Sequence, residues 1–254
     1  MPVPGKSTVA ERAAIKGGRG RAVLAGCALV ACLAVLLSLG TWQMQRLAWK
    51  ERLLADMTER RHATPVAIEA IEQVKREGGD IEYRPVTVTG VFDHGRERHF
   101  LATFNGQSGY HVYTPLQMAD GRFVFVNRGF VPFDRKEPQT RREGEVEGVQ
   151  AISGLARDSL AGKPSALVPD NDLAKNIFYW KDLSAMASSD GIAPEALVPF
   201  FVDAGAAPNP GGLPIGGVTQ FDLPNNHLQY AMTWYGLALA LVGVSGLYIW
   251  RSRR

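Results

Sequence analysis

One histidine, His227, stands at the start of a long uncharged segment of the chain. Twenty residues without a charge, 231–250, lie between it and three arginines. At about 1.5 Å per residue, a helix of that length crosses the roughly 30 Å core of a bilayer. Tyr230, Ala231 and Trp234 follow His227 at i+3, i+4 and i+7, on its side of a helix. An imidazole above this face is either an interfacial anchor or a ligand for a flat apolar group.

A second group of side chains that could bind a ligand follows the first apolar segment. Trp42, Arg46 and Trp49 are spaced i, i+4 and i+7, so a helix would stack them on one side. They form either an aromatic belt with a snorkelling arginine or a cationic, aromatic wall that could hold a carboxylate or a flat ring. The helix is predicted to end near Arg61, because Thr64-Pro65 disfavours helical geometry.

The first apolar segment, residues 22–40, has nineteen residues without a charge and follows a basic leader. It can be a cleaved signal peptide, a lipoprotein signal with Cys27 or Cys32 as the modified residue, or a transmembrane helix. Its length favours the helix, since the apolar region of a signal peptide covers only about 7–15 residues. Both cysteines of the chain lie in this segment, so no disulfide is expected in the rest.

Basic residues lie before the first apolar segment and after the second, which places both ends of the chain in the cytoplasm. Between the segments, 20 basic and 24 acidic side chains give no basic patch for nucleic acid. Glu11 in the leader is unlike a mitochondrial transit peptide and favours a bacterial plasma membrane. The predicted organisation is a basic tail at 1–21, a transmembrane helix at 22–42, an extracytoplasmic, periplasmic β-rich domain at 43–226, a transmembrane helix at 227–250 and a basic tail at 251–254.

The middle domain alternates apolar and polar residues in short runs separated by turn residues. The class expected is therefore an α+β membrane protein with a mostly antiparallel sheet or barrel-like β domain. Its predicted helices are 66–76 and 183–189, and residues 204–217, with three prolines and five glycines, are predicted to be a linker back to the membrane. The predicted strands are 83–92, 99–104, 110–116, 123–131, 149–155 and 200–203.

The middle domain shows little catalytic chemistry. His94, His99 and His111 could form a copper or zinc site, but their separation and the lack of cysteine partners favour hydrogen-bonded histidines. Arg128, on a strand with apolar flanks, is predicted to need a buried carboxylate partner. The sequence has no Gly-rich phosphate loop, no His-Glu-x-x-His and no nucleophile elbow, so the chain is not expected to be an enzyme.

The two apolar helices are predicted to pack against each other. Gly236, Ala240 and Gly243 offer small residues on one helix, which let a neighbouring backbone come close. The matching small residues of the first helix are Ala28, Ala31 and Cys32. The same pairing would bring His227 and Trp234 beside Arg46, Trp42 and Trp49 in a pocket at the outer membrane surface.

Five motifs follow one another in a fixed order along the chain. They are Leu39-Gly40-Thr41-Trp42-Gln43 with Arg46, Trp49 and Lys50; Tyr83-Arg84-Pro85-Val86-x-Val88-x-Gly90-x-Phe92; Gly109-Tyr110-His111-Val112-x-Thr114-Pro115; Val126-Asn127-Arg128-Gly129-Phe130-Val131-Pro132; and Asn225-Asn226-His227-Leu228-Gln229-Tyr230-Ala231-x-Thr233-Trp234-Tyr235. Together these motifs resemble the Surfeit locus protein 1 family. The similarity covers about residues 37–250; Phe130 stands where the family more often has tryptophan, and residues 203–212 look like an insertion.

The resemblance implies an assembly factor for haem-copper cytochrome c oxidase with no catalytic role. It implies that haem a is bound transiently, with His227 as the iron ligand, and passed to the large oxidase subunit. The haem a synthase is a further candidate partner, and membrane lipid surrounds the helices. Trp234 and Tyr230 could then stack on the macrocycle, and Arg46, between Trp42 and Trp49, could meet a propionate.

A protein of another class fits the same residues. A scaffold that stabilises an assembly intermediate of the oxidase without touching haem would have the same two helices and the same β domain. The sequence does not separate the carrier from the scaffold. The absorbance of the purified protein does, because only a haem carrier has a Soret band. A haem-modifying enzyme is a distant third hypothesis, since no acid, base or redox constellation is present.

Overall fold

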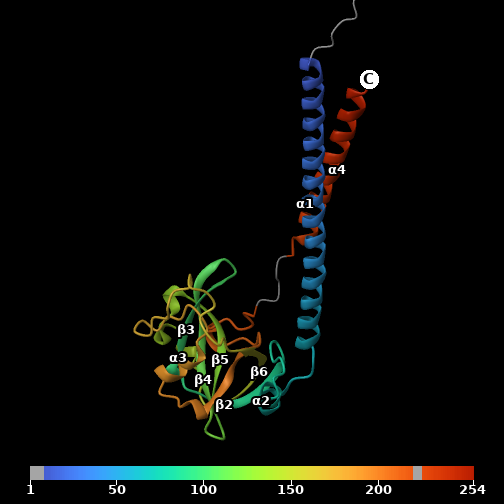
Figure 1. Cartoon of the computed structure of the whole chain (residues 1–254). Helices are drawn as coiled ribbons and strands as arrows, with labels where there is room; N and C mark the ends of the chain where they lie inside the picture. Colours follow the sequence, from blue (N-terminus) through green and yellow to red (C-terminus); the bar gives the residue numbers. More distant parts are fainter. Residues whose placement is uncertain (1–8, 220–224) are drawn as a thin grey trace, which may run out of the picture. The chain divides into compact units, whose positions relative to one another are not determined.

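The chain folds into two compact units, a helical unit and a β unit. The computed structural model describes residues 9–219 and 225–254, which divide into 9–54 with 225–254, and 55–219. The helical unit contains most of α1 (Val9–Arg61) and all of α4 (His227–Ser252), which lie side by side in Figure 1. Helix α1 ends at Arg61, which confirms the boundary expected from Thr64-Pro65.

Helices α1 and α4 are both long and apolar enough to cross a membrane. Large apolar side chains project from them without cover from the rest of the chain: Val30 is 66% exposed and Leu239 75%. Surfaces of this kind on two long helices suit a hydrocarbon solvent. The two membrane-spanning candidates expected from the sequence are therefore present, one before and one after the sheet-rich unit in the chain.

The two helices contact each other along a seam whose positions alternate in steps of three and four residues. Steps that average 3.5 residues are typical of helices that pack side chain to side chain over several turns. The less exposed positions are Leu29, Leu33, Leu36, Gly40 and Gln43 on α1, and His227, Ala231, Trp234, Ala238, Leu241 and Ser245 on α4. The helices run antiparallel, because His227 meets Gln43 whereas Tyr235, two turns later, meets Gly40.

The small residues that form this contact differ from those predicted. Gly236 and Gly243 have no atom within 4 Å of the place where a Cβ would be, and Ala240 is exposed. Ala231 and Ala238, seven residues apart, are buried instead, at 1% and 3% exposure. The predicted packing of the two helices is present, and Ala31, Cys32 and Ala240 line one hollow between them. Gly236 and Gly243 lie outside the contact because small residues recur on two faces of α4, and only one of these faces carries His227.

Gly40 is where the two helices come closest to a steric limit. A Cβ on Gly40 would lie 2.7 Å from the ring of Tyr235. We expect Gly40→Leu to push α4 away from α1, because the side chain has no space unless the tyrosine ring moves. Spin labels at the exposed positions Val30 and Leu239, in a Cys27→Ser, Cys32→Ser background, would report a longer and broader distance distribution.

The matched control is Gly236→Leu, which adds the same side chain on the open face of α4. It should leave the label distance unchanged. A distance that responds to the Gly236 variant and ignores the Gly40 variant would show that the helices pack on the other face.

The β unit is built on a seven-stranded sheet within the described residues. The strand order is β1-β2-β6-β7-β5-β4-β3, and a further pairing of β2 with β4 closes β2, β6, β7, β5 and β4 into a ring. The pairings β1–β2 and β5–β7 are parallel and the others antiparallel. The strands are β1 (Val66–Ala67), β2 (Pro85–Phe92), β3 (Arg98–Phe104), β4 (Gln107–Met118), β5 (Phe123–Pro132), β6 (Val149–Asp158) and β7 (Leu197–Ala204).

Two short helices cover the ring. Ile68 and Ile71 of α2 (Ile68–Arg76) join an aliphatic cluster with Val86, Leu116 and Val126 from the strands. Leu183 and Met186 of α3 (Leu183–Ser189) join a separate aromatic cluster around Tyr113, Phe125 and Phe201. Single turns of 3-10 helix lie at His94–Arg96, Phe133–Arg135, Pro138–Thr140, Arg142–Gly144, Pro194–Ala196 and Pro210–Gly212.

Residues 204–217 are not a free linker, contrary to the expectation from their prolines and glycines. Ile215 exchanges two backbone hydrogen bonds with Phe130, and Val218 is buried against the same unit. Gly129 makes this possible: its φ is +128°, and a Cβ there would lie 1.9 Å from the carbonyl oxygen of Ile215. The segment therefore belongs to the β unit, and its glycines serve close backbone contact.

Candidate cofactor site

His227 opens α4 with its imidazole turned toward α1. Asn226 occupies the N-cap position of α4, but its side chain makes no capping bond. Nδ1 of His227 lies 2.7 Å from Oε1 of Gln43, which is only 9% exposed. Among the described residues, Nε2 of His227 has no hydrogen-bond partner. The ring is thus held to the first helix through one nitrogen, and the other is left to bind a ligand.

The predicted aromatic residues of α4 divide between the seam and the open surface. Trp234 lies in the seam, two turns along the helix from His227, and is half-buried. Tyr230 is one turn from His227 and is 54% exposed. Its position at i+3 puts it beside the imidazole rather than beneath it. An apolar ring bound at His227 could therefore contact both side chains.

The three residues predicted on α1 form a group of their own. The guanidinium of Arg46 stacks on the ring of Trp49, with 3.8 Å from Cζ to the ring centroid. Trp42 and Trp49 are about half exposed. In helical projection all three lie within about 120° of Gln43 on one side. No hydrogen bond or ion pair joins Arg46 to His227 in the part of the chain that the structure describes. The group therefore lies on one flank of Gln43, the residue that contacts the histidine.

The side chains around His227 have the chemistry that binds a haem. A neutral imidazole nitrogen with a free lone pair is a haem-iron ligand, and half-exposed indoles and a tyrosine offer apolar contact to a macrocycle. Arg46 is a cationic side chain about one helical turn after Gln43, and its guanidinium suits a propionate. Cys27 and Cys32 are exposed in the first helix and lie more than two turns from Gln43, so they take no part in this set.

The β unit holds a second unusual group, a buried carboxylate between two buried arginines. Glu97 contacts Arg141 through both carboxylate oxygens, and its Oε1 lies 3.6 Å from a terminal nitrogen of Arg128. All three are at most 5% exposed. The carboxylate predicted for Arg128 is therefore Glu97. Arg128 also donates to the carbonyl of Gly144.

Burial and charge shift the pKa values of this group in opposite senses. Burial works to raise the pKa of Glu97, but the contacts with His94 and with the guanidinium of Arg141 together outweigh it, and the pKa falls to about 2. Burial lowers the pKa of Arg128 to about 10, which leaves it fully charged at neutral pH. One carboxylate thus balances two cations in the interior, and the geometry must be well satisfied by hydrogen bonds.

The three histidines of the β unit do not assemble. Nε2 of His94 lies 2.9 Å from the carbonyl oxygen of Val146 and donates to it, so Nδ1 accepts from Arg128. Burial lowers the pKa values of His99 and His111 to about 4. In the described residues no cluster of three or more metal-binding side chains occurs. The expectation of hydrogen-bonded histidines holds for His94 and for Nδ1 of His99, which contacts Asn176. Nε2 of His99 and Nε2 of His111 are buried without a hydrogen-bond partner among the described residues.

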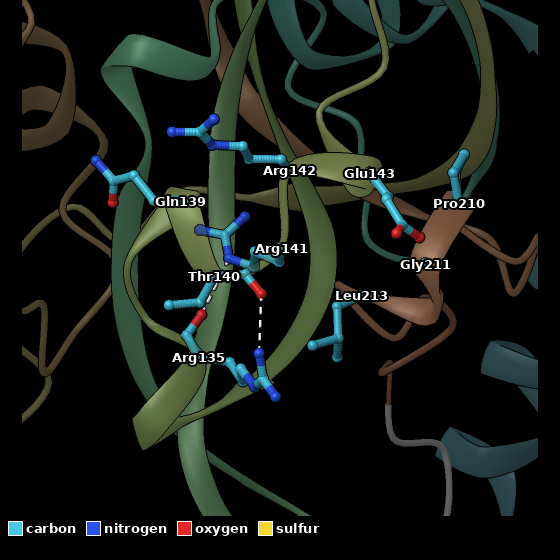
Figure 2. A pocket seen from close by; sticks show the side chains of 9 residues that line it. All are labelled: Arg135, Gln139, Thr140, Arg141, Arg142, Glu143, Pro210, Gly211 and Leu213. Atoms are coloured by element: carbon cyan, nitrogen blue, oxygen red, sulfur yellow. Dashed lines mark hydrogen bonds between the residues drawn. The ribbon is translucent and has the colours of Figure 1, made fainter.

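A polar pocket of about 390 Å³ lies on the outside of the ion network (Figure 2). Arg141 forms part of its wall and is already bonded to Glu97 and to the carbonyl of Arg135. Arg135 in turn donates to the carbonyl of Thr140. Arg142 and Glu143 extend in opposite directions from adjacent positions. The pocket is therefore the outer surface of a structural network, and its charged groups do not converge on one point.

The chain has one candidate span before and one after a small β-ring unit in sequence, and an imidazole starts the second span. This organisation fits a membrane protein. Comparisons with known proteins give the family. A model of the SURF1 family matches residues 30–239. Surfeit locus protein 1 from Xenopus tropicalis is 38% identical over 230 residues, covering 84% of this chain and 70% of the relative.

Further relatives support the same assignment. The Homo sapiens protein of that name is 38% identical over 219 residues, which are 80% of this chain and 70% of the relative. A SURF1-like protein of Monosiga brevicollis is 35% identical over 224 residues, or 83% of this chain and 82% of the relative. The chain belongs to the SURF1 family, known as cytochrome c oxidase assembly factors, and the resemblance recognised in the sequence is confirmed.

Sequence reasoning missed three residues that the structure brings forward. Gln43 stood inside a family motif, but only the fold shows that it faces His227. A polar residue between Gly40 and Leu47, at seam spacing, is the signal that could have drawn attention to it. Glu97 and Arg141 gave no signal, because they lie in charged, turn-like stretches that resemble solvated surface.

Proposed function

We propose that this chain is an assembly factor for haem-copper cytochrome c oxidase that binds haem a at the outer membrane interface. It would aid insertion of the haem into the large oxidase subunit. The observation that carries the proposal is the orientation of His227, whose Nδ1 is held by Gln43 while Nε2 is free to bind a ligand. Family membership supplies the oxidase, and the imidazole supplies the iron ligand.

Each residue of the site has a simple role in this proposal. His227 would donate Nε2 to iron, and haem itself would supply only the metal and the flat apolar ring. Trp234 and Tyr230 offer stacking surface, worth about 0.5–1.5 kcal/mol for an aromatic pair beyond its buried area. Arg46, stacked on Trp49 and one helical turn from Trp42, can turn its guanidinium to a propionate.

The partners follow from the same proposal. The large subunit of cytochrome c oxidase would receive the haem, and the haem a synthase would supply it. Membrane lipid surrounds the exposed faces of α1 and α4. Affinity purification from cells that cannot complete the oxidase should recover the large subunit with this chain; its consistent absence would contradict an assembly role. Nothing in the proposal requires catalysis by this chain, because a carrier only binds and releases.

A scaffold without haem remains the second candidate, and one observation favours it. The open face of α4, with Gly236 and Gly243, has no partner among the described residues and could meet another membrane helix. The test is the absorbance of protein purified from cells that make haem a. A Soret band supports the carrier, and colourless protein supports the scaffold.

We propose that the chain lies in a bacterial plasma membrane, with both termini cytoplasmic and the β unit periplasmic. The support is the basic residues that flank the apolar segments, which stay on the cytoplasmic side. We expect a reporter that is active only in the cytoplasm to be active when fused after Arg254. Activity there of a reporter that works only when exported would contradict this orientation.

A further inference from the structure

Gln43 is the polar residue at the centre of the contact between α1 and α4. It is 9% exposed and lies between Leu36 and Leu47 on the seam, one turn from Gly40. A buried amide that is not hydrogen-bonded costs free energy, roughly 1–3 kcal/mol judged from mutations in proteins. Leucine would fill this position at no such cost. The amide at this point therefore serves the histidine that it contacts.

The contact determines which nitrogen of His227 carries the proton. Oε1 of Gln43 has only lone pairs and accepts a hydrogen bond, so Nδ1 of His227, at 2.7 Å, must be the donor. A neutral imidazole carries one N–H. With the proton on Nδ1, Nε2 has the free lone pair that a metal ligand needs.

We propose that Gln43 is a positioning residue that fixes the tautomer and the ring orientation of His227 for iron ligation through Nε2. The inference rests on the proposed haem-binding function and adds to it the residue that prepares the ligand. A ligating histidine commonly donates its other N–H to an oxygen acceptor, which sets its orientation and its basicity. Gln43 supplies that acceptor from the opposite helix.

The neutral amide also fits transient binding. A carboxylate acceptor gives a histidine more electron density and a stronger bond to its metal than an amide does. A carrier that must release its haem is better served by the weaker ligand. Gln43→Glu should therefore preserve the tautomer and hold haem more tightly, whereas Gln43→Leu should lose the tautomer.

The first test uses the full-length protein in its cofactor-free form, with histidine labelled by ¹⁵N, in detergent or nanodiscs. The ring nitrogen shifts of His227, assigned by comparison with His227→Ala, should show protonated Nδ1 in the wild type. Gln43→Leu should move the population toward protonated Nε2, which free neutral imidazole prefers. Protonated Nε2 in the wild type, or no change in Gln43→Leu, would overturn the proposal.

The second test measures haem binding in the same variants. By analogy with other metal-ligand supports, Gln43→Leu should weaken haem retention about 10–100-fold. Gln43→Glu should hold haem more tightly than the wild type and shift the iron reduction potential downward, a change that a packing role would not produce. Equal loss in both variants would contradict the positioning role. Gln45→Leu, a change of the same kind on the exposed side of α1, is the matched control and should leave both measurements unaltered.

The outcomes separate this inference from the function on which it rests. Wild-type protein that binds no haem but shows the Gln43-dependent tautomer would refute the carrier and leave the positioning contact intact. A haem spectrum that depends on His227 but is insensitive to Gln43 would support the carrier and refute the positioning role of Gln43. The spin-label distance between the helices serves as the structural check, because Gln43→Leu is expected to leave it unchanged.

Discussion

Replacing His227 with alanine is expected to abolish the Soret band of protein purified from cells that make haem a. Among the described residues of this site, the imidazole is the group placed to ligate iron, and haem held only by stacking and a propionate contact would be lost on purification. Insertion in the membrane should persist, since the apolar residues that drive it begin after His227. Absorbance per mole of protein and the yield in the membrane fraction are the two measurements.

His62→Ala provides the matched control for this variant. His62 follows the end of α1, is exposed, and lies outside the contact between the helices. The His62→Ala protein should keep the wild-type spectrum. An unchanged spectrum in His227→Ala protein would refute ligation by this residue. Loss of the protein from the membrane in that variant alone would show that His227 acts first as an anchor.

The sequence predicted the strands well because their pattern is local. The alternation of apolar and polar residues located six of the seven strands, with ends that differ by up to three residues. Phe200, for example, lies three residues inside β7 (Leu197–Ala204). The alternation carries no information on strand neighbours, so the parallel pairing of β5 with β7 and the closure of β2 on β4 had to come from the structure.

The contacts that could not be predicted from the sequence join residues that are far apart in the chain. Glu97 and Arg141 are 44 residues apart, and neither has a neighbour that marks it as buried. Gln43 and His227 are 184 residues apart. A polar residue in an apolar helix is visible in the sequence, but its partner becomes evident only when the two helices are placed together.

The largest stability effect is expected at Glu97. Glu97→Gln removes the carboxylate charge that pairs with Arg141 and Arg128, and its amide group would face guanidinium donors that need acceptors. Breaking a buried ion pair in this way costs about 3–5 kcal/mol. We expect the free energy of unfolding of the full-length protein to fall by that amount. The measurement is chemical denaturation, with hydrogen exchange of the β5 amides as the readout.

Asp134→Asn is the control for loss of a carboxylate without burial. Asp134 is 78% exposed and lies 3.8 Å from Arg135, so its removal should cost less than about 1 kcal/mol. Equal effects of the two substitutions would show that the network around Glu97 is no more important than a surface pair.

The pH dependence of stability provides an independent check on the same carboxylate. Its pKa is about 2 in the folded protein, below the ordinary value of 4.5. A carboxylate with a lowered pKa stabilises the fold above its unfolded pKa and loses that contribution as the pH falls through the folded value. The difference in unfolding free energy between wild type and Glu97→Gln should thus shrink by about 3 kcal/mol between pH 5 and pH 2. A difference that stays constant over this range would mean that Glu97 is not held as a buried anion.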